Sequence, residues 1–355
     1  MKTTAAVLTE INKPLQIEEL SIPPLKKGQV LIKVAYSGIC HSQLNEIRGM
    51  KGEDRFLPHT LGHEGSGIVL ETGPDVTKVK PEDHVVLTWI KGNGHDVPST
   101  QYIRKNGSFV NSGAISTFLS HAIISENRLV SITKQMPLKE SALLGCAIPT
   151  GAGIVNNTAK IKPGQTVAVF GCGGIGLSAI LMAGSINMTN KTNCTTIIAI
   201  DIMDTKLNLA QTLGATHIIN AHKTDSLKSI LDITNGQGVD FAIEAAGLCE
   251  TMETAFCCVK DNGGLCILAG NLPHGKTIQI DPFNLIKGKR IVGTWGGETS
   301  PDYDIPLYEK SILSGKIDLK PLITQNYLLP QINDAVREME TGAAGRSLIK
   351  LHDAS

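Results

Sequence analysis

The sequence has few aromatic residues, no surplus of either charge and no long uncharged apolar run. Aromatic residues make up 4% of the 355 residues, and 33 basic residues balance 33 acidic ones. This balance argues against nucleic acid and anionic membranes as partners, because both attract an excess of Lys and Arg. No stretch approaches the roughly 18 uncharged apolar residues that a membrane span requires. We therefore expect a small-molecule partner, no nucleic acid and no membrane.

The cysteines show no pairing pattern. There are eight cysteines and no C-x-x-C pair, and a chain of this size does not need disulfides for stability. The segment Met1–Glu10 carries an apolar run that Glu10 interrupts, which is too short for a secretory signal. We expect reduced thiols and a cytoplasmic protein.

The length of 355 residues suggests two domains, at roughly 150 residues each. Up to about residue 145, short apolar runs alternate with Gly and Pro, which predicts a β-rich domain. From Thr166 onward, apolar runs alternate with helix-length segments, which predicts an α/β domain with a doubly wound parallel sheet. The expected strands are Val30–Ala35, Gly67–Leu70, Val85–Leu87, Val167–Phe170, Ile197–Ile200, Ile218–Ile219, Val239–Ile243, Leu265–Leu268 and Ile291–Thr294.

Three helices can be predicted towards the C-terminus. Leu207, Ala210 and Leu213 share one helix face, and Gly214 is a suitable C-terminal stop. Further helices are expected at Ile305–Leu313 and Gln331–Met339, in a tail that could return to the first domain. The Asn- and Thr-rich segment Asn187–Thr196 is interpreted as a surface loop.

A glycine-rich motif follows the expected strand that ends at Phe170. Its residues fit G-x-G-x-x-G and open a helix, so the backbone N–H groups and the helix dipole can receive a pyrophosphate. Asp201 ends the next strand, where a carboxylate accepts hydrogen bonds from an adenosine ribose and repels a 2′-phosphate, which favours NAD over NADP. The alternative is a turn that merely joins strand to helix, with Asp201 capping the next element. The motif residues expected to bind NAD are Gly171, Gly173, Gly174, Ile175 and Gly176.

Three glycine-flanked segments carry potential metal ligands. They place Cys40, His63 and Cys146 beside glycines that let the backbone bend around an ion. Two thiolates and one imidazole suit zinc, and three protein ligands leave the open position of a catalytic site. Taken singly, each cysteine could be a small buried apolar residue and the histidine an ordinary packed group.

The order of these motifs resembles that of the zinc-dependent medium-chain alcohol dehydrogenases. The resemblance rests on Cys40, the run from Gly62 to Gly67, Cys146 and the glycine motif from Gly171, and it covers nearly the whole chain. It implies a GroES-like β-rich catalytic domain formed by residues 1–148 and 296–355. It also implies a Rossmann dinucleotide-binding domain formed by residues 149–295.

The resemblance also implies roles for single residues. Cys40, His63 and Cys146 would hold one catalytic Zn²⁺ per chain, Glu64 would lie close behind the metal, and Ser42 would receive the substrate proton. Trp89 would line the substrate pocket. The implied cofactor contacts outside the glycine motif and Asp201 are His41, Thr150, Lys206 and Arg346.

The sequence departs from the family pattern in three places. Lys91–Asn111, where members carry four cysteines for a structural zinc, contains none, so we expect a polar loop without that metal. Asn45 stands where a histidine often ends the proton relay, and an amide cannot take a proton at neutral pH. Gln43 replaces an Asp that orients the zinc-bound histidine, and a neutral partner would make this ligand less basic.

These observations favour an NAD-dependent, zinc-containing alcohol dehydrogenase over two alternatives. One is a biosynthetic dehydrogenase of a cyclic polyol or sugar-like alcohol, because the shortened loop after Trp89 could open the pocket. The other is a non-catalytic NAD-binding scaffold, suggested by Asn45 and Gln43. The resemblance implies a homodimer or homotetramer, and the segment Ile291–Trp295 could pair edge to edge across a two-fold axis.

Overall fold

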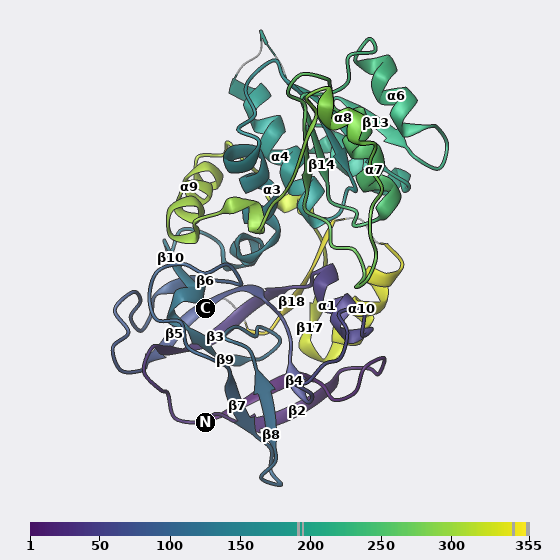
Figure 1. Cartoon of the computed structure of the whole chain (residues 1–355). Helices are drawn as coiled ribbons and strands as arrows, with labels where there is room; N and C mark the ends of the chain where they lie inside the picture. The colour runs from purple at the N-terminus through teal and green to yellow at the C-terminus, as the bar shows by residue number, and fades with distance from the viewer. Residues whose placement is uncertain (190–191, 194, 343–344, 353–355) are drawn as a thin grey trace. The chain divides into compact units, whose positions relative to one another are not determined.

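The computed structural model describes residues 1–189, 192–193, 195–342 and 345–352, and the chain forms two compact units (Figure 1). Unit 1 comprises Met1–Cys146, Ser300–Ser314 and Ile323–Ser355, and unit 2 comprises Ala147–Thr299 and Gly315–Leu322. We expected boundaries near residues 148 and 296. The units divide at Cys146 and Thr299, and unit 2 also takes a short segment from the C-terminal region.

Unit 1 contains a small closed barrel. Its strands follow the order β1-β2-β7-β8-β4. Alternate residues of the strands point inward, and Ala5, Leu20 and Tyr102 are fully buried in the core. The barrel strands are β1 (Lys2–Leu8), β2 (Gln16–Ser21), β4 (His59–Thr60), β7 (Thr100–Ile103) and β8 (Phe109–Ser112).

A second sheet of unit 1 joins the N-terminal strands to the C-terminal tail. The order is β10-β6-β5-β3-β18-β17, and β9 also pairs with β3. β18 pairs antiparallel with β3, with Leu348 opposite Gly38, so the end of the chain completes the sheet. Its strands are β3 (Gln29–Gly38), β5 (Glu64–Thr72), β6 (His84–Thr88), β9 (His121–Ser125), β10 (Leu129–Ile132), β17 (Ile323–Leu328) and β18 (Arg346–Lys350).

Most helical segments of unit 1 are short, and α9 is the longest of those described, with 13 residues. α1 begins directly after β3, and α10 packs beside it. The segments are α1 (His41–Ile47), α2 (Leu138–Ser141), α9 (Pro301–Leu313) and α10 (Ile332–Glu340), with single turns at Glu126–Arg128, Ala142–Gly145 and Leu329–Gln331.

Unit 2 is built on a six-stranded parallel sheet with the order β13-β12-β11-β14-β15-β16. The strand order reverses beside β11, where β12 lies on one side and β14 on the other, which is the switch point at which such sheets bind ligands. The doubly wound parallel sheet predicted from the sequence is thereby confirmed. The strands are β11 (Thr166–Phe170), β12 (Thr196–Asp201), β13 (His217–Asn220), β14 (Phe241–Glu244), β15 (Leu265–Leu268) and β16 (Arg290–Gly293).

Helices connect the parallel strands of unit 2. Leu207 and Ala210 on α5 are buried, as is Leu213 at its C-cap, and Gly214 has the positive φ of +115° that ends this helix. The helices are α3 (Ala147–Gly153), α4 (Gly174–Thr189), α5 (Asp204–Thr212), α6 (Ser226–Ile233), α7 (Cys249–Cys258) and α8 (Pro282–Ile286), with a π-turn at Ile154–Thr158 and 3-10 turns at Gly296–Glu298 and Lys320–Leu322.

Two expectations about loops need correction. The segment Lys91–Asn111 is not a loop throughout, because Thr100–Ile103 and Phe109–Ser112 pair as the β7–β8 hairpin of the barrel. In the expected loop Asn187–Thr196, residues 190, 191 and 194 lie outside the described residues. Thr195, at the end of this loop, is buried, and its N–H donates to Asn187 Oδ1 at 2.6 Å. The expected loop is therefore too long, because Asn187 belongs to α4 and Thr196 begins β12.

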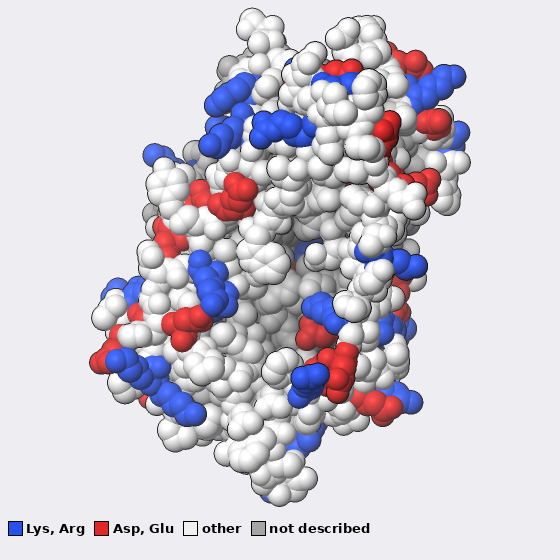
Figure 2. Space-filling model, in the orientation of Figure 1, with Lys and Arg blue, Asp and Glu red and all other residues white. Residues whose placement is uncertain are grey.

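The charged side chains of the two signs are intermixed on the face shown in Figure 2. This distribution accords with the formal net charge of 0. Within the described residues, no helix combines the length and the apolar character needed to cross a membrane.

Candidate active site

Cys40 lies between β3 and α1, at the N-cap position of the helix. Its backbone N–H donates to Oε1 of Gln43 at 2.9 Å, and the Gln43 N–H donates to the Cys40 carbonyl at 2.9 Å. This reciprocal pair fixes the turn from which the Cys40 thiol extends.

His63 directly precedes β5, and Gly62 determines how the chain reaches it. Gly62 has a φ of +94°, and a Cβ at this position would lie 2.2 Å from Oγ1 of Thr117. A larger residue would therefore displace the backbone that carries the imidazole. The Nδ1 of His63 contacts the side-chain amide of Gln43, while its Nε2 lies 3.2 Å from the Cys146 sulfur.

Cys146 follows the helical turn Ala142–Gly145 and is buried. A Cβ on Gly145 would lie 2.2 Å from the Leu87 carbonyl oxygen and 2.8 Å from Cα of Glu64. Gly145 therefore allows the turn to pack against β5 and β6, which brings the Cys146 sulfur to His63.

The ligand atoms of Cys40, His63 and Cys146 all lie within 4.8 Å of one another, so the structure brings the three predicted ligands together. A hydrogen bond from the Cys146 thiol, together with His63 and Arg346, holds the pKa of Cys40 well below its ordinary value, although burial opposes this shift. The thiolate is the form that binds a metal. Two sulfur donors and one imidazole nitrogen fit Zn²⁺ with a fourth position open.

A buried ion pair lies beside these ligands. Glu64, whose side chain is 0% exposed, pairs with Arg346 of β18, whose side chain is 7% exposed. Gly38 makes room for the carboxylate, because a Cβ there would lie 2.5 Å from Oε1 of Glu64. The structure therefore places Arg346 against Glu64 and within electrostatic reach of Cys40. Its expected cofactor contact stays a prediction.

Three further predicted residues lie on the same unit. His41 and Ser42 are the first two residues of α1, His41 exposed and Ser42 partly buried. Trp89 directly follows β6, and its ring lies edge-on to His63 with a centroid separation of 6.5 Å. The indole therefore lies beside one of the three predicted ligands, and its role in the substrate pocket stays a prediction.

The glycine motif of unit 2 begins where β11 ends. Gly171 has a φ of +89°, and a Cβ on Gly176 would lie 1.9 Å from the Gly171 carbonyl oxygen, so both positions require glycine. A Cβ on Gly173 would meet no atom of the described residues within 4 Å, which leaves open space over the loop among them. Gly174 and Ile175 form the first turn of α4. This is the geometry that accepts a pyrophosphate.

Asp201 ends β12 beside this loop. Its Oδ2 accepts the Cys172 N–H at 2.8 Å, and its Oδ1 accepts the Met203 N–H at 3.0 Å. These two hydrogen bonds fix the turn after β12, but Asp201 does not cap α5, because the N-cap of this helix is Met203 and it has no side-chain cap hydrogen bond. A carboxylate offers about four acceptor sites, so these two hydrogen bonds leave capacity for ribose hydroxyls.

Two other expected cofactor contacts also lie in unit 2. The Thr150 side chain on α3 is buried, and its Oγ1 has no hydrogen-bond partner within the described residues. A buried hydroxyl without a partner is suited to a polar group of a bound cofactor. Lys206 is partly buried on α5, close to the Cys172–Asp201 turn.

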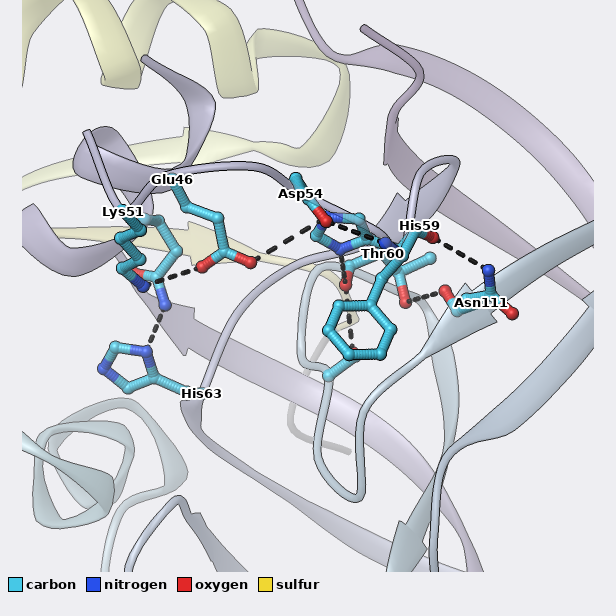
Figure 3. A network of polar contacts seen from close by, with 10 residues as sticks. Glu46, Lys51, Asp54, His59, Thr60, His63 and Asn111 are labelled. Carbon is cyan, nitrogen blue, oxygen red and sulfur yellow. Dashed lines mark hydrogen bonds and ion pairs between the residues drawn. The ribbon is translucent and has the colours of Figure 1, made fainter. Parts of the chain in front are cut away.

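Sequence reasoning missed a polar group near His63. Glu46, Asp54 and His59 place their ligand atoms within 4.8 Å of one another (Figure 3). They come from α1, the following loop and β4. The spacing of positions 46, 54 and 59 along the sequence matches no metal-binding motif. Only the fold brings them together.

Comparisons with known proteins agree with this geometry. Residues 26–134 match the family described as alcohol dehydrogenase GroES-like domain, and residues 174–310 match zinc-binding dehydrogenase. The S-(hydroxymethyl)glutathione dehydrogenase of Synechocystis sp. is 34% identical over 98% of this chain and 100% of its own length. That of Escherichia coli O157:H7 is 34% identical over 99% of this chain and 100% of its own length.

Solved structures show the same similarity. An alcohol dehydrogenase zinc-binding domain protein from Burkholderia ambifaria superposes with a TM-score of 0.90 and is 31% identical, covering 99% of this chain and 100% of its own. The benzyl alcohol dehydrogenase of Acinetobacter calcoaceticus gives a TM-score of 0.88 at 31% identity, with the same coverage.

The chain belongs to the zinc-dependent medium-chain alcohol dehydrogenases. It is an NAD-linked, zinc-containing oxidoreductase that acts on alcohols, as the sequence predicted. The comparisons do not favour the cyclic-polyol alternative.

Proposed function

We propose that this enzyme interconverts an alcohol and its aldehyde or ketone with NAD, using Cys40, His63 and Cys146 to hold one catalytic zinc ion. The observation that carries the proposal is the convergence of two sulfur atoms and one imidazole nitrogen within 4.8 Å, on three separate turns of which two are shaped by glycines. When bound, zinc would supply a Lewis acid that lowers the pKa of an alcohol.

The other side chains position the ligands and handle the proton. Gln43 holds the Cys40 turn and the His63 ring. Glu64 and Arg346 form a neutral buried pair beside the ligands. We assign the receipt of the substrate proton to the Ser42 hydroxyl. We assign the apolar wall of the substrate site to Trp89.

On unit 2, the loop from Gly171 to Gly176 would receive the pyrophosphate of NAD. Asp201 would accept the ribose hydroxyls and repel a 2′-phosphate, and Thr150 would hydrogen-bond the cofactor with its buried hydroxyl. Lys206, His41 and Arg346 complete the proposed cofactor contacts. Bound NAD would accept the hydride from the carbinol carbon.

We also propose a homo-oligomer, dimer or tetramer, that functions in the cytoplasm. β16 is an edge strand of its sheet, and Trp295 beyond it is 77% exposed, which supports pairing with a second copy. Light scattering of the purified protein measures the assembly, and a mass of one chain would contradict it.

The activity test combines metal analysis with turnover. The purified wild-type enzyme should reduce NAD while it oxidises alcohols from a panel of candidates. The panel includes benzyl alcohol and S-(hydroxymethyl)glutathione, because these two compounds appear in the names of relatives. Cys146→Ala should lose zinc and turnover while its affinity for NADH stays unchanged. Wild-type turnover in Cys146→Ala would overturn the proposal, and zinc binding without oxidation of any alcohol would favour the scaffold alternative.

A further inference from the structure

A chamber of about 240 Å³ lies in unit 1 on the Gln43 side of His63. Both His63 and Gln43 line it, and so do Glu46 and His59. The rest of its wall is mixed, with polar side chains such as Asn111 beside apolar ones. The polar contacts around it form the network in Figure 3.

His59 is 6% exposed and oriented by its neighbour. Its Nδ1 lies 3.2 Å from the Thr60 carbonyl oxygen, which can only accept, so Nδ1 carries a hydrogen. This contact is the one that typically orients a metal-binding histidine, because it leaves the lone pair on Nε2. Nε2 lies 2.7 Å from Oδ2 of Asp54 and 3.8 Å from Oε1 of Glu46.

Each carboxylate has one oxygen fixed by a donor outside the group and the other directed at His59. Lys51 Nζ lies 2.9 Å from Oε2 of Glu46, and the Phe56 N–H donates to Oδ1 of Asp54 at 2.9 Å. The oxygens Oε1 and Oδ2 remain on the side of Nε2. At 2.7 Å, Nε2 lies within hydrogen-bonding distance of Asp54, so either a proton on Nε2 or a metal ion bound between the three groups balances the charge of the carboxylates.

We propose that Glu46, Asp54 and His59 bind a divalent transition-metal ion, separate from the cysteine-ligated site. None of the three residues is fully exposed, and their ligand atoms lie within 4.8 Å of one another. Two carboxylates and one imidazole suit Zn²⁺ or Mn²⁺, whereas the thiolates of the other site select zinc. The two carboxylates outweigh the single ammonium of Lys51, so the group stays net negative. Three protein ligands leave a further position for water or a small anion from the chamber.

This inference does not depend on the proposed function, because it uses none of the residues that hold the catalytic zinc. Such an ion would join α1 to the loop that leads into β4. It would thereby stabilise the wall of the chamber beside His63.

The test counts metal ions in the metal-stripped full-length protein by titration with Zn²⁺ alone. Wild type should bind two equivalents, and Asp54→Asn and His59→Gln should each bind one. Cys146→Ala should lose the other equivalent, and combining it with Asp54→Asn should abolish both. The control His222→Ala, at an exposed histidine of unit 2, should keep two equivalents.

Asp54→Asn and His59→Gln should each keep the zinc ion at the cysteine site. This bound ion would show that the variants are folded. A single equivalent in wild type, lost in Cys146→Ala, would overturn the proposal. Two equivalents retained in both Asp54→Asn and His59→Gln would overturn it as well, since the second ion would then bind elsewhere. Loss of alcohol turnover with an unchanged number of bound zinc ions per chain would bear on the proposed function alone.

Discussion

The side-chain amide of Gln43 contacts Nδ1 of His63, and the same amide accepts the Cys40 N–H with its oxygen. The group that faces the imidazole is therefore the NH₂ of Gln43, which is a donor. A neutral histidine that binds zinc through Nε2 carries its hydrogen on Nδ1. When His63 binds zinc, its Nδ1–H and the NH₂ of Gln43 are therefore two donors that face each other. The Gln43 side chain can accept a hydrogen bond from the Cys40 N–H or from His63, but not from both.

We expect Gln43→Glu to raise the zinc affinity of the cysteine site by about 10- to 100-fold, the range over which partners of metal-binding histidines act. A carboxylate accepts both the Cys40 N–H and the Nδ1–H of His63. Competition with a chelator measures the affinity. Asn45→Asp is the matched control, because it adds the same charge on the opposite side of α1. An equal gain in both variants would show that charge alone is responsible.

The buried pair of Glu64 and Arg346 predicts a large loss of stability when it is broken. Arg346→Met should reduce the free energy of unfolding by about 3–5 kcal/mol, because it leaves the Glu64 carboxylate buried without a counter-charge. Urea unfolding measures this change. Adding Glu64→Gln to Arg346→Met should recover part of the loss.

The control for this prediction is the pair of Arg337 and Asp334, whose side chains are 67% and 51% exposed. Arg337→Met should change the free energy of unfolding by less than about 1 kcal/mol. Similar losses in Arg346→Met and Arg337→Met would contradict a specific role for the buried pair.

Asp201 predicts a joint change in cofactor preference and stability. Asp201→Gly should weaken NADH binding and raise the affinity for NADPH relative to NADH, because the repulsion of the 2′-phosphate is removed. It should also reduce the free energy of unfolding by about 1–2 kcal/mol, since the N–H groups of Cys172 and Met203 lose their acceptor. Fluorescence titration with each cofactor measures the preference.

Asp225→Ala is the control, because Asp225 caps α6 by accepting the Lys228 N–H, and replacing an N-cap by Ala costs about 1 kcal/mol. It should lose stability to a similar degree while its affinities for both cofactors stay at the wild-type values. An unchanged ratio of the two affinities in Asp201→Gly would show that another group selects the cofactor.

Local patterns in the sequence predicted those parts of the fold and of the site that depend on residues close together along the chain. The apolar runs located the parallel strands of unit 2, and the glycines at positions 171 and 176 identified the loop, because only glycine fits their backbone. The predicted strand Val239–Ile243 begins two residues too early and ends one residue too early, since β14 runs from Phe241 to Glu244. The contact of Gln43 with His63 also follows from the expected position of Gln43 beside the metal.

Features that depend on distant pairing were not predictable. The β7–β8 hairpin is exposed at alternate positions, so its polar sequence resembles that of a loop. The approach of Arg346 to Glu64 requires β18 to pair with β3. The meeting of Glu46, Asp54 and His59 requires the turn between α1 and β4. Periodicity gives no signal for any of these contacts.

The pH dependence of stability provides the last prediction, centred on His121. Burial, followed by His352 and Lys33, lowers the pKa of His121 to about 4. The His352 ring lies 4.9 Å away, and Ser120 contacts the Nδ1 of His121 at 3.3 Å. In the unfolded chain a histidine has a pKa near 6.5.

Between about pH 6.5 and pH 4 the unfolded state therefore binds a proton at His121 that the folded state does not. The contribution of neutral His121 to stability is present above about pH 6.5 and is lost as the pH falls towards 4. From pH 7 to pH 5, wild type should lose about 1 kcal/mol more than His121→Gln, a value reduced for the partial exposure of this side chain. Urea unfolding at the two pH values measures the difference, and His222→Gln should follow wild type. Parallel losses in wild type and His121→Gln would show that other groups determine the acid sensitivity of unit 1.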